Sequence, residues 1–178
     1  AFDDFRRLGF PTRKVEKYKY TDMDAIFSPD YGLNLNRLDI PVNPYDVFRC
    51  DAPNPRTSLY FALNNAFYSR PMPKSTLPAR AENPGFIADY YARIARTDTD
   101  AVTALNTMLA QDGLLVHVPR NVKVERAIQV INILRADVDL MVNRRVLIVL
   151  DEGAEARLLF CDHTADERRF LATQVTEV

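Results

Sequence analysis

The chain has 178 residues, with 23 Lys and Arg against 24 Asp and Glu, which gives a net charge of -1. This balance excludes a nucleic-acid binder that works through bulk positive charge. The 47% of apolar and 26% of charged residues are typical of a globular protein, and the length predicts one large domain or two small ones.

The cysteine content and the apolar runs indicate a compartment. Cys50 and Cys161 are too few for a disulfide framework, so we expect a reduced, cytoplasmic environment. No apolar run reaches the length of a membrane span, and the first residues lack the pattern of a signal peptide. We therefore expect neither a membrane nor a nucleic acid as partner.

The first third of the chain predicts short helices joined by loops. Apolar residues at helical spacing predict a helix over residues 2–8 that ends at Gly9. A capping pattern predicts a second helix over residues 22–27. Residues 28–55 are rich in Pro, Asn and Asp, which predicts a loop with one short strand over residues 47–50.

A β-hairpin and two further helices follow. Residues 58–63 have strand composition, and the Asn pair after them predicts a tight turn and a return over residues 66–68. Asn and Pro at 83–84 predict the start of a helix, and a second helix is expected over residues 100–111, ended by Gly113. The buried stripe of the first of these helices is expected at Phe86, Ile87, Tyr90 and Ile94.

The period changes from helix to strand near residue 113, and this predicts a boundary between residues 1–112 and 113–178. Five strands are expected at residues 114–118, 127–134, 146–150, 156–161 and 170–178. The turns between them are expected at residues 119–121, 137–143, 151–153 and 163–167. Several of the strands are apolar on both faces, which favours strands that are covered on both sides or wound into a solenoid.

Few residues of the sequence could perform chemistry. Cys161 and His163 would lie on the same face of a strand and could share a soft metal ion or serve an enzyme. The alternative is a small buried Cys161 followed by a loop that begins at His163, and the lack of a third ligand favours it. His117 is expected to be half-buried and hydrogen-bonded. The sequence has no Ser or Cys nucleophile in a recognisable turn and no glycine-rich loop for a phosphate.

Residues 13–20 combine four basic residues with two tyrosines. Such a stretch could bind RNA or an anionic ligand. It could also be a structured connection that is anchored by its aromatic rings and keeps its charges in water. The neutral net charge favours the second interpretation.

Residues 9–21 read Gly-Phe-Pro-Thr-Arg-Lys-Val-Glu-Lys-Tyr-Lys-Tyr-Thr and resemble the N-terminal signature of the SufD group in the SufB/SufD family of iron–sulfur cluster assembly proteins. Tyr18 stands where that signature has Trp, and Asn121 stands where the family has Gly. Further passages similar to the family lie at residues 105–122, 152–156 and 170–178. Residues 160–161 are Phe-Cys where family members often have Glu-His, so no role of that pair is carried over.

The resemblance implies an α+β fold. Residues 1–112 would form a mainly helical N-terminal region with a β-hairpin, and residues 113–178 would form the first turns of a right-handed parallel β-helix, truncated here. The implied function is a non-enzymatic scaffold in the cytoplasmic SUF (SufBCD) complex, with a SufB-like subunit and a SufC-like ATPase as partners. The iron–sulfur cluster and ATP would belong to the assembled complex, and no catalytic, cofactor-binding or metal residue is assigned to this chain.

The sequence also leaves open a second function and predicts self-association. The alternative function is a stand-alone β-rich module that binds carbohydrate or peptide, with Tyr60, Phe61, Phe67 and Tyr68 as its aromatic surface. For the scaffold fragment, we expect self-association through the last two strands. These strands would expose backbone groups and the apolar side chains of Leu171, Val175 and Val178.

Overall fold

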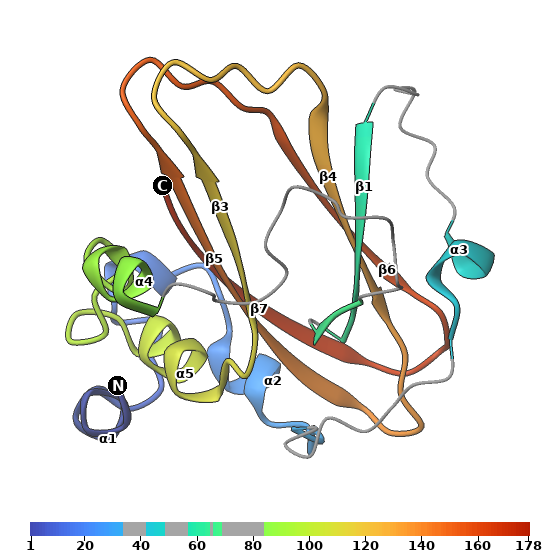
Figure 1. Ribbon diagram of the computed structural model, residues 1–178. Coiled ribbons are helices and arrows are strands. Elements are labelled where there is room, and N and C mark those ends of the chain that lie inside the picture. The colour runs from blue at the N-terminus through green and yellow to red at the C-terminus, as the bar shows by residue number, and fades with distance from the viewer. Residues whose placement is uncertain (34–41, 49–56, 65, 69–83) are drawn as a thin grey trace.

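The computed structural model describes residues 1–33, 42–48, 57–64, 66–68 and 84–178. It is an α+β structure in which short helices gather around two small sheets (Figure 1). This confirms the α+β class and the presence of parallel strands.

The helices of the first region begin where their capping residues predict. Helix α1 (Phe2–Leu8) ends at Gly9, which takes a positive φ of 66° and donates its N–H to the Phe5 carbonyl. The side chain of Asp22 accepts the Ala25 N–H and caps α2 (Met23–Phe27). Asp100 caps α5 (Ala101–Leu109) in the same way. The remaining helices are the 3₁₀ turn η1 (Glu16–Tyr18), α3 (Pro44–Val47) and α4 (Pro84–Tyr90).

After the first hairpin, the strands alternate between the two sheets along the chain. One sheet has the order β3-β5-β7, formed by Gly113–Val118, Leu140–Leu150 and Phe170–Glu177, with all pairs parallel. The other has the order β2-β1-β4-β6, formed by Ala66–Phe67, Thr57–Leu63, Ala127–Leu134 and Leu158–Thr164. The β1–β2 pair is the predicted hairpin, and Asn64 has a positive φ of 47° in its turn.

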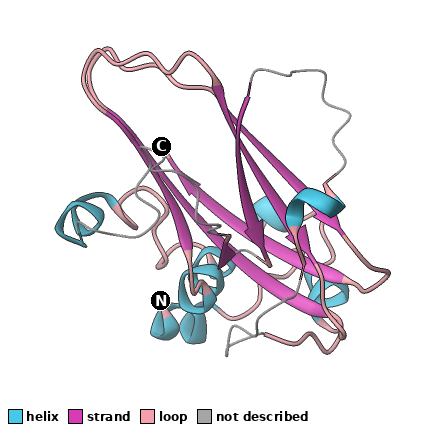
Figure 2. Cartoon of the chain, turned by 45° about the vertical axis from the view of Figure 1, so that its right-hand side comes forward, coloured by secondary structure: helices cyan, strands magenta, loops and turns pink. Residues whose placement is uncertain are grey.

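Paired residues on neighbouring parallel strands of β3 to β7 are separated by a nearly constant number of positions in the sequence. Both β4–β6 and β5–β7 pair residues that are 30 positions apart, as in Ile128 with Leu158 and Leu140 with Phe170. The β3–β5 pair has an offset of 32, as in Leu114 with Val146. The loops that join β3 to β4 and β5 to β6 also run side by side and are hydrogen-bonded to each other (Figure 2).

The core lies between and beside the two sheets. Alternate side chains of β3, β4 and β5 form the central cluster, made by Val116, Val118, Ile128, Val130, Val146 and Ile148. A second cluster covers the opposite face of β1 and β4, where Phe61, Ile131 and Ile133 pack against the end of α3. Figure 1 shows α3 on the side of the molecule away from α1, α2, α4 and α5.

Gly113 lies in a close approach to the neighbouring strand and does not end a helix. A Cβ at this position would lie 3.0 Å from the carbonyl oxygen of Arg145 on the neighbouring strand. Helix α5 already ends at Leu109, with Ala110 at its C-cap. The buried residues of α5 are Ala101, Ala104, Leu105 and Asn106.

Several predicted elements are wrong. The turn expected at 137–143 is strand from Leu140 onward, and the strand expected at 156–161 begins at Leu158 and continues to Thr164. Val47 ends helix α3 instead of starting a strand, and residues 49–50 lie outside the described part of the chain. Helix α4 stops at Tyr90, so Ile94 lies beyond it and is exposed, as is Tyr90. Asn83 is not among the described residues.

Candidate interaction surface

The buried side-chain amide of Asn106 hydrogen-bonds helix α5 to the outer face of the β3-β5-β7 sheet. The Nδ2 atom of Asn106 donates to the carbonyl oxygens of Arg144 and Thr173, both at 3.2 Å, and to the Thr173 hydroxyl at 2.7 Å. Asn106 is fully buried, and Thr173 in turn donates to Asn143 at 2.7 Å. The helix is thereby bonded to β5 and β7 at once.

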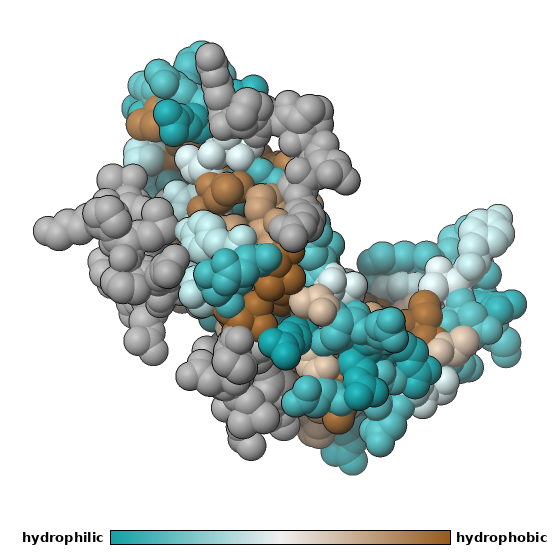
Figure 3. All heavy atoms as spheres, turned by 90° about the vertical axis from the view of Figure 1, so that its right-hand side faces the viewer, coloured by the Kyte–Doolittle hydropathy of each residue, from teal (hydrophilic) through white to brown (hydrophobic). Residues whose placement is uncertain are grey.

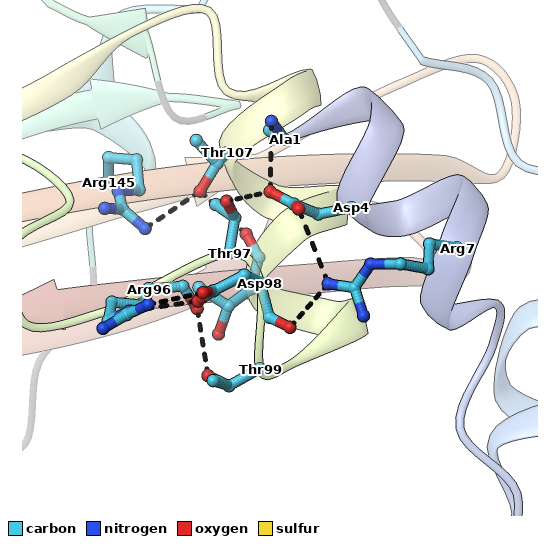
Figure 4. Close-up of polar contacts among 10 residues, drawn as sticks. Ala1, Asp4, Arg7, Arg96, Thr97, Asp98, Thr99, Thr107 and Arg145 are labelled. Carbon is cyan, nitrogen blue, oxygen red and sulfur yellow. Dashed lines mark hydrogen bonds and ion pairs between the residues drawn. The ribbon is translucent and has the colours of Figure 1, made fainter.

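Helix α1 is bonded to the segment that leads into α5 (Figure 4). The Thr97 hydroxyl donates to Asp4 at 2.5 Å, and Arg7 donates to the carbonyl oxygen of Asp98 at 2.8 Å. The hydrogen bond from Thr97 is the main cause that lowers the pKa of Asp4. These bonds, together with the packing of α1 on α5, hold the N-terminus against the helical region.

The basic-aromatic segment is anchored through Tyr18, as the second interpretation of residues 13–20 predicted. The Tyr18 hydroxyl donates to the carboxylate of Asp100 at 2.8 Å, and Lys17 pairs with the same carboxylate. Burial and this hydrogen bond raise the pKa of Tyr18 well above its usual range. Burial alone would raise the pKa of Asp100, but its bonds to Lys17, Thr103 and Tyr18 outweigh burial and lower it. Tyr20, by contrast, is 92% exposed and anchors nothing.

Strands β6 and β7 each form one edge of their sheet, and β3 forms the other edge of the β3-β5-β7 sheet. Within the described part of the chain, β6 pairs only with β4 and β7 pairs only with β5. The opposite edge of the second sheet is different, because the short antiparallel strand β2 ends it there. The backbone groups on the free sides of β6 and β7 are therefore available to another strand.

A polar layer crosses the space between the sheets and reaches these open edges. Asn132 on β4 donates to Asp162 on β6 at 2.9 Å, and Arg144 on β5 binds both oxygens of Asp162 at 3.1 and 3.0 Å. Arg144 also donates from Nε to Gln174 on β7 at 2.7 Å and lies over the Phe160 ring. Paired partners make the burial of this guanidinium tolerable in an otherwise apolar interior.

The exposed side chains of β7 before Val178 are small or polar, where apolar ones were expected. Ala172, Gln174 and Thr176 are exposed and alternate with the buried Thr173 and Glu177. Leu171 and Val175 are half-buried, because they share the face that α5 covers. Only Val178 of the three expected residues is strongly exposed. The edge therefore offers backbone and polar groups more than an apolar patch.

Cys161 and His163 share one face of β6, as the strand period predicts, and His163 belongs to the strand instead of beginning a loop. The Cys161 thiol accepts a hydrogen bond from Gln129 at 3.6 Å, and the His163 ring packs edge-on against Phe48. The Nε2 atom of His163 is buried without a partner among the described residues. Across the same residues, no group of three His, Cys, Asp or Glu side chains is arranged to hold a metal ion.

His117 is more exposed than predicted, although it is satisfied. Its Nε2 lies 3.1 Å from a carboxylate oxygen of Asp151, and its ring stacks on Phe86 of α4 with centroids 4.6 Å apart. The ring and the carboxylate are each more than a third exposed. His117 therefore joins α4 to the end of β3 and has no arrangement of groups around it that suggests catalysis.

The aromatic surface of the alternative binding module is partly core. Phe61 is 3% exposed in the cluster beside α3, and Tyr60 packs on the central cluster. Tyr68 packs against the cluster of Phe61, and the side chain of Phe67 lies outside the described residues. Figure 3 shows apolar side chains gathered in the middle of the face that it presents, with hydrophilic ones around them. No exposed row of aromatic rings is therefore available from the described members of this set.

The residues that organise this surface were not found from the sequence. Asn106, Arg144, Arg145, Asp162 and Glu177 are polar residues that become informative only when the register is known. Their partners lie 18 to 85 positions away along the chain. A charged pair within an apolar strand, as at 144–145, is the one signal that could have suggested buried ionic contacts.

Comparison with known proteins matches most of the chain to one family. A family model described as "SufBD protein N-terminal region" matches residues 1–130. No curated protein and no solved structure matches the chain. Within the described residues, no helix is both long and apolar enough to span a membrane.

Proposed function

This chain belongs to the SufBD protein family, and we propose that it is the N-terminal part of a SufD-like scaffold in the SUF iron–sulfur cluster assembly complex. In this proposal the chain is not an enzyme and acts in the cytoplasm. Its role is to begin a β structure on which partner subunits assemble, and to close the first end of that structure.

The open edges of β6 and β7 are the observation that carries this proposal. Both strands have a parallel partner 30 positions earlier in the chain, and each has its other side free among the described residues. A chain that continues with the same spacing would add parallel strands to both sheets. We therefore propose that residues 113–178 are the first turns of a parallel β-helix. A right-handed helix is supported by the strong preference of parallel crossovers for that hand.

Residues 1–112 would then form the cap of this β-helix. Strand β1 takes the place of a preceding parallel strand beside β4, and β2 ends that sheet with an antiparallel return. Helix α5 covers the outer face of the other sheet at β5 and β7. The cap blocks addition of strands to β1, so growth would proceed from β6 and β7.

The partners in this proposal are a SufB-like subunit and a SufC-like ATPase, which bind the part of the scaffold that follows. ATP belongs to the ATPase, and the iron–sulfur cluster is the product that the complex builds. No residue of this chain is assigned to either. We expect the isolated chain to hydrolyse no ATP above a buffer blank, which a phosphate-release assay measures.

A substitution at an exposed position of β7 tests the proposal. We introduce Ala172→Glu into the full reading frame that contains this chain and co-express it with a SufB-like subunit and a SufC-like ATPase. The added carboxylate would lie in the interior of the next turn, so we expect the ATPase to be lost from the purified complex. Arg168→Glu, in the exposed turn before β7, is the matched control and should assemble normally. Normal assembly of both variants would contradict the proposal.

The isolated chain gives a second test. We expect two copies to pair through β6 and β7, because a closed dimer is the commonest way to cover such an edge. Light scattering after size-exclusion chromatography measures the mass. A monomer at high micromolar concentration, with the amides of residues 170–178 protected from exchange, would mean that these edges need no further strand.

A further inference from the structure

The segment between α4 and α5 surrounds a carboxylate from the last strand. The backbone N–H groups of Ile94 and Ala95 both donate to Oε1 of Glu177 at 3.0 Å, and the N–H of Ala92 donates to Oε2 at 3.0 Å. Nη2 of Arg145 also donates to Oε2, at 2.6 Å. Each carboxylate oxygen thus has two donors, which suits a planar, two-oxygen anion.

The donors are held in place by the local backbone and by packing. Ala92 has a positive φ of 59°, and this left-handed residue turns successive N–H groups toward one point, as in an anion-binding nest. Arg145 stacks over the Tyr91 ring, with its Cζ 4.5 Å from the ring centroid, and donates to the hydroxyl of Thr107 (Figure 4). The Nε atom of Arg145 is buried and has no partner within the described residues.

The site is buried and favours negative charge. The side chains of Arg145 and Glu177 are 5% and 1% exposed. Burial alone would raise the pKa of Glu177, but the N–H groups of residues 95, 92 and 94 and the guanidinium outweigh it, so the pKa lies below its usual range. The donors therefore recognise the ionised carboxylate.

We infer that residues 91–95 and Arg145 form a carboxylate-binding site whose ligand is the side chain of Glu177, and that the site binds a free carboxylate when this side chain is removed. Since Glu177 lies at the end of the edge strand β7, the site joins the helical region to that edge. Displacement of β7 would leave four donors without an acceptor and would release the segment between α4 and α5.

Chemical rescue of Glu177→Ala in the whole chain tests the inference. Removing one partner of a buried ion pair should lower the melting temperature by about 10 °C. Sodium formate, a carboxylate small enough for the vacated space, should restore part of that loss with a saturating concentration dependence. Sodium chloride at equal ionic strength should restore none of it. Hydrogen exchange should show renewed protection at the amides of residues 92, 94 and 95 in formate.

Two further variants keep the result interpretable. Glu155→Ala removes an exposed carboxylate that pairs with Lys123, and formate should leave its melting temperature unchanged. Glu177→Gln is the second readout if the alanine variant does not fold. Its amide group can accept through only one oxygen, so the amides that donate to the other position should exchange faster. Equal responses to formate and chloride, or unchanged exchange at residues 92, 94 and 95 in Glu177→Gln, would overturn the inference.

Discussion

The buried amide of Asn106 should be one of the strongest single determinants of stability in the chain. Its replacement by Ala removes three donor contacts, at 3.2, 3.2 and 2.7 Å, and leaves the acceptors on β5 and β7 in a dry interface. A buried polar group without a partner costs about 1–3 kcal/mol, and the vacated space adds to this. We therefore expect a loss of about 3 kcal/mol in the free energy of unfolding.

Urea unfolding followed by far-ultraviolet circular dichroism measures this loss as a lower midpoint at an unchanged slope. Asn106→Asp should cost more than Asn106→Ala, because it places a carboxylate against two carbonyl oxygens. Lys123→Ala, at an exposed ion pair, is the control and should cost less than about 0.5 kcal/mol. A loss within about 0.5 kcal/mol for Asn106→Ala would show that α5 does not depend on this amide.

Other substitutions and pH test neighbouring features. Gly153→Ala should lower the free energy of unfolding, measured in urea, more than Gly9→Ala does. Both glycines have a positive φ, of 71° and 66°, but only at Gly153 would a Cβ lie 2.5 Å from the side-chain oxygen of Asn121. Tyr18→Phe removes a hydrogen bond to a carboxylate and should lower the free energy of unfolding by about 1.5 kcal/mol, whereas Lys17→Ala should lower it by less than about 0.5 kcal/mol. If thermal melts gave the reverse order, the segment would be a charged binding surface. Because the folded pKa of Glu177 is lowered, its stabilisation is complete above the unfolded value near ~4.3 and is lost as pH falls through the folded value. Urea unfolding between neutral and acidic pH should therefore show a shallower decline in Glu177→Gln, and identical slopes would contradict this.

Local patterns in the sequence predicted the elements whose causes are local. Capping by Asp22 and Asp100, the C-cap at Gly9 and the turn at Asn64 depend on residues within a few positions of one another. The hairpin and the strands β3, β4 and β7 followed from short apolar runs. These signals lie within a few positions of one another in the sequence, so local patterns are enough to predict the elements.

The strand that was mistaken for a turn shows what local patterns lack. Asn143, which ends the expected turn, and Arg144 and Arg145, which follow it, are polar, and polar clusters usually mark turns. In the structure they are buried because partners on β6, β7 and α5 satisfy them. The carboxylate site around Glu177 could not be predicted from the sequence for the same reason, because its donors lie far away along the chain. Knowledge of the register is needed before such residues can be recognised as core.

The even register offsets constrain how the length of this chain can change during evolution. Residues 121 and 153 contact each other in stacked loops and are 32 positions apart, whereas the paired residues Ile128 and Leu158 are 30 positions apart. Between these points the second loop is therefore two residues shorter than the first. A change of two preserves which side chains face each core cluster, while a change of one would move Val130 into the place of Ile131 and shift the rest of the strand to the opposite face. Natural variants of this region should therefore gain or lose residues in pairs at its corners, and single-residue insertions should be confined to the loops outside the stacked turns.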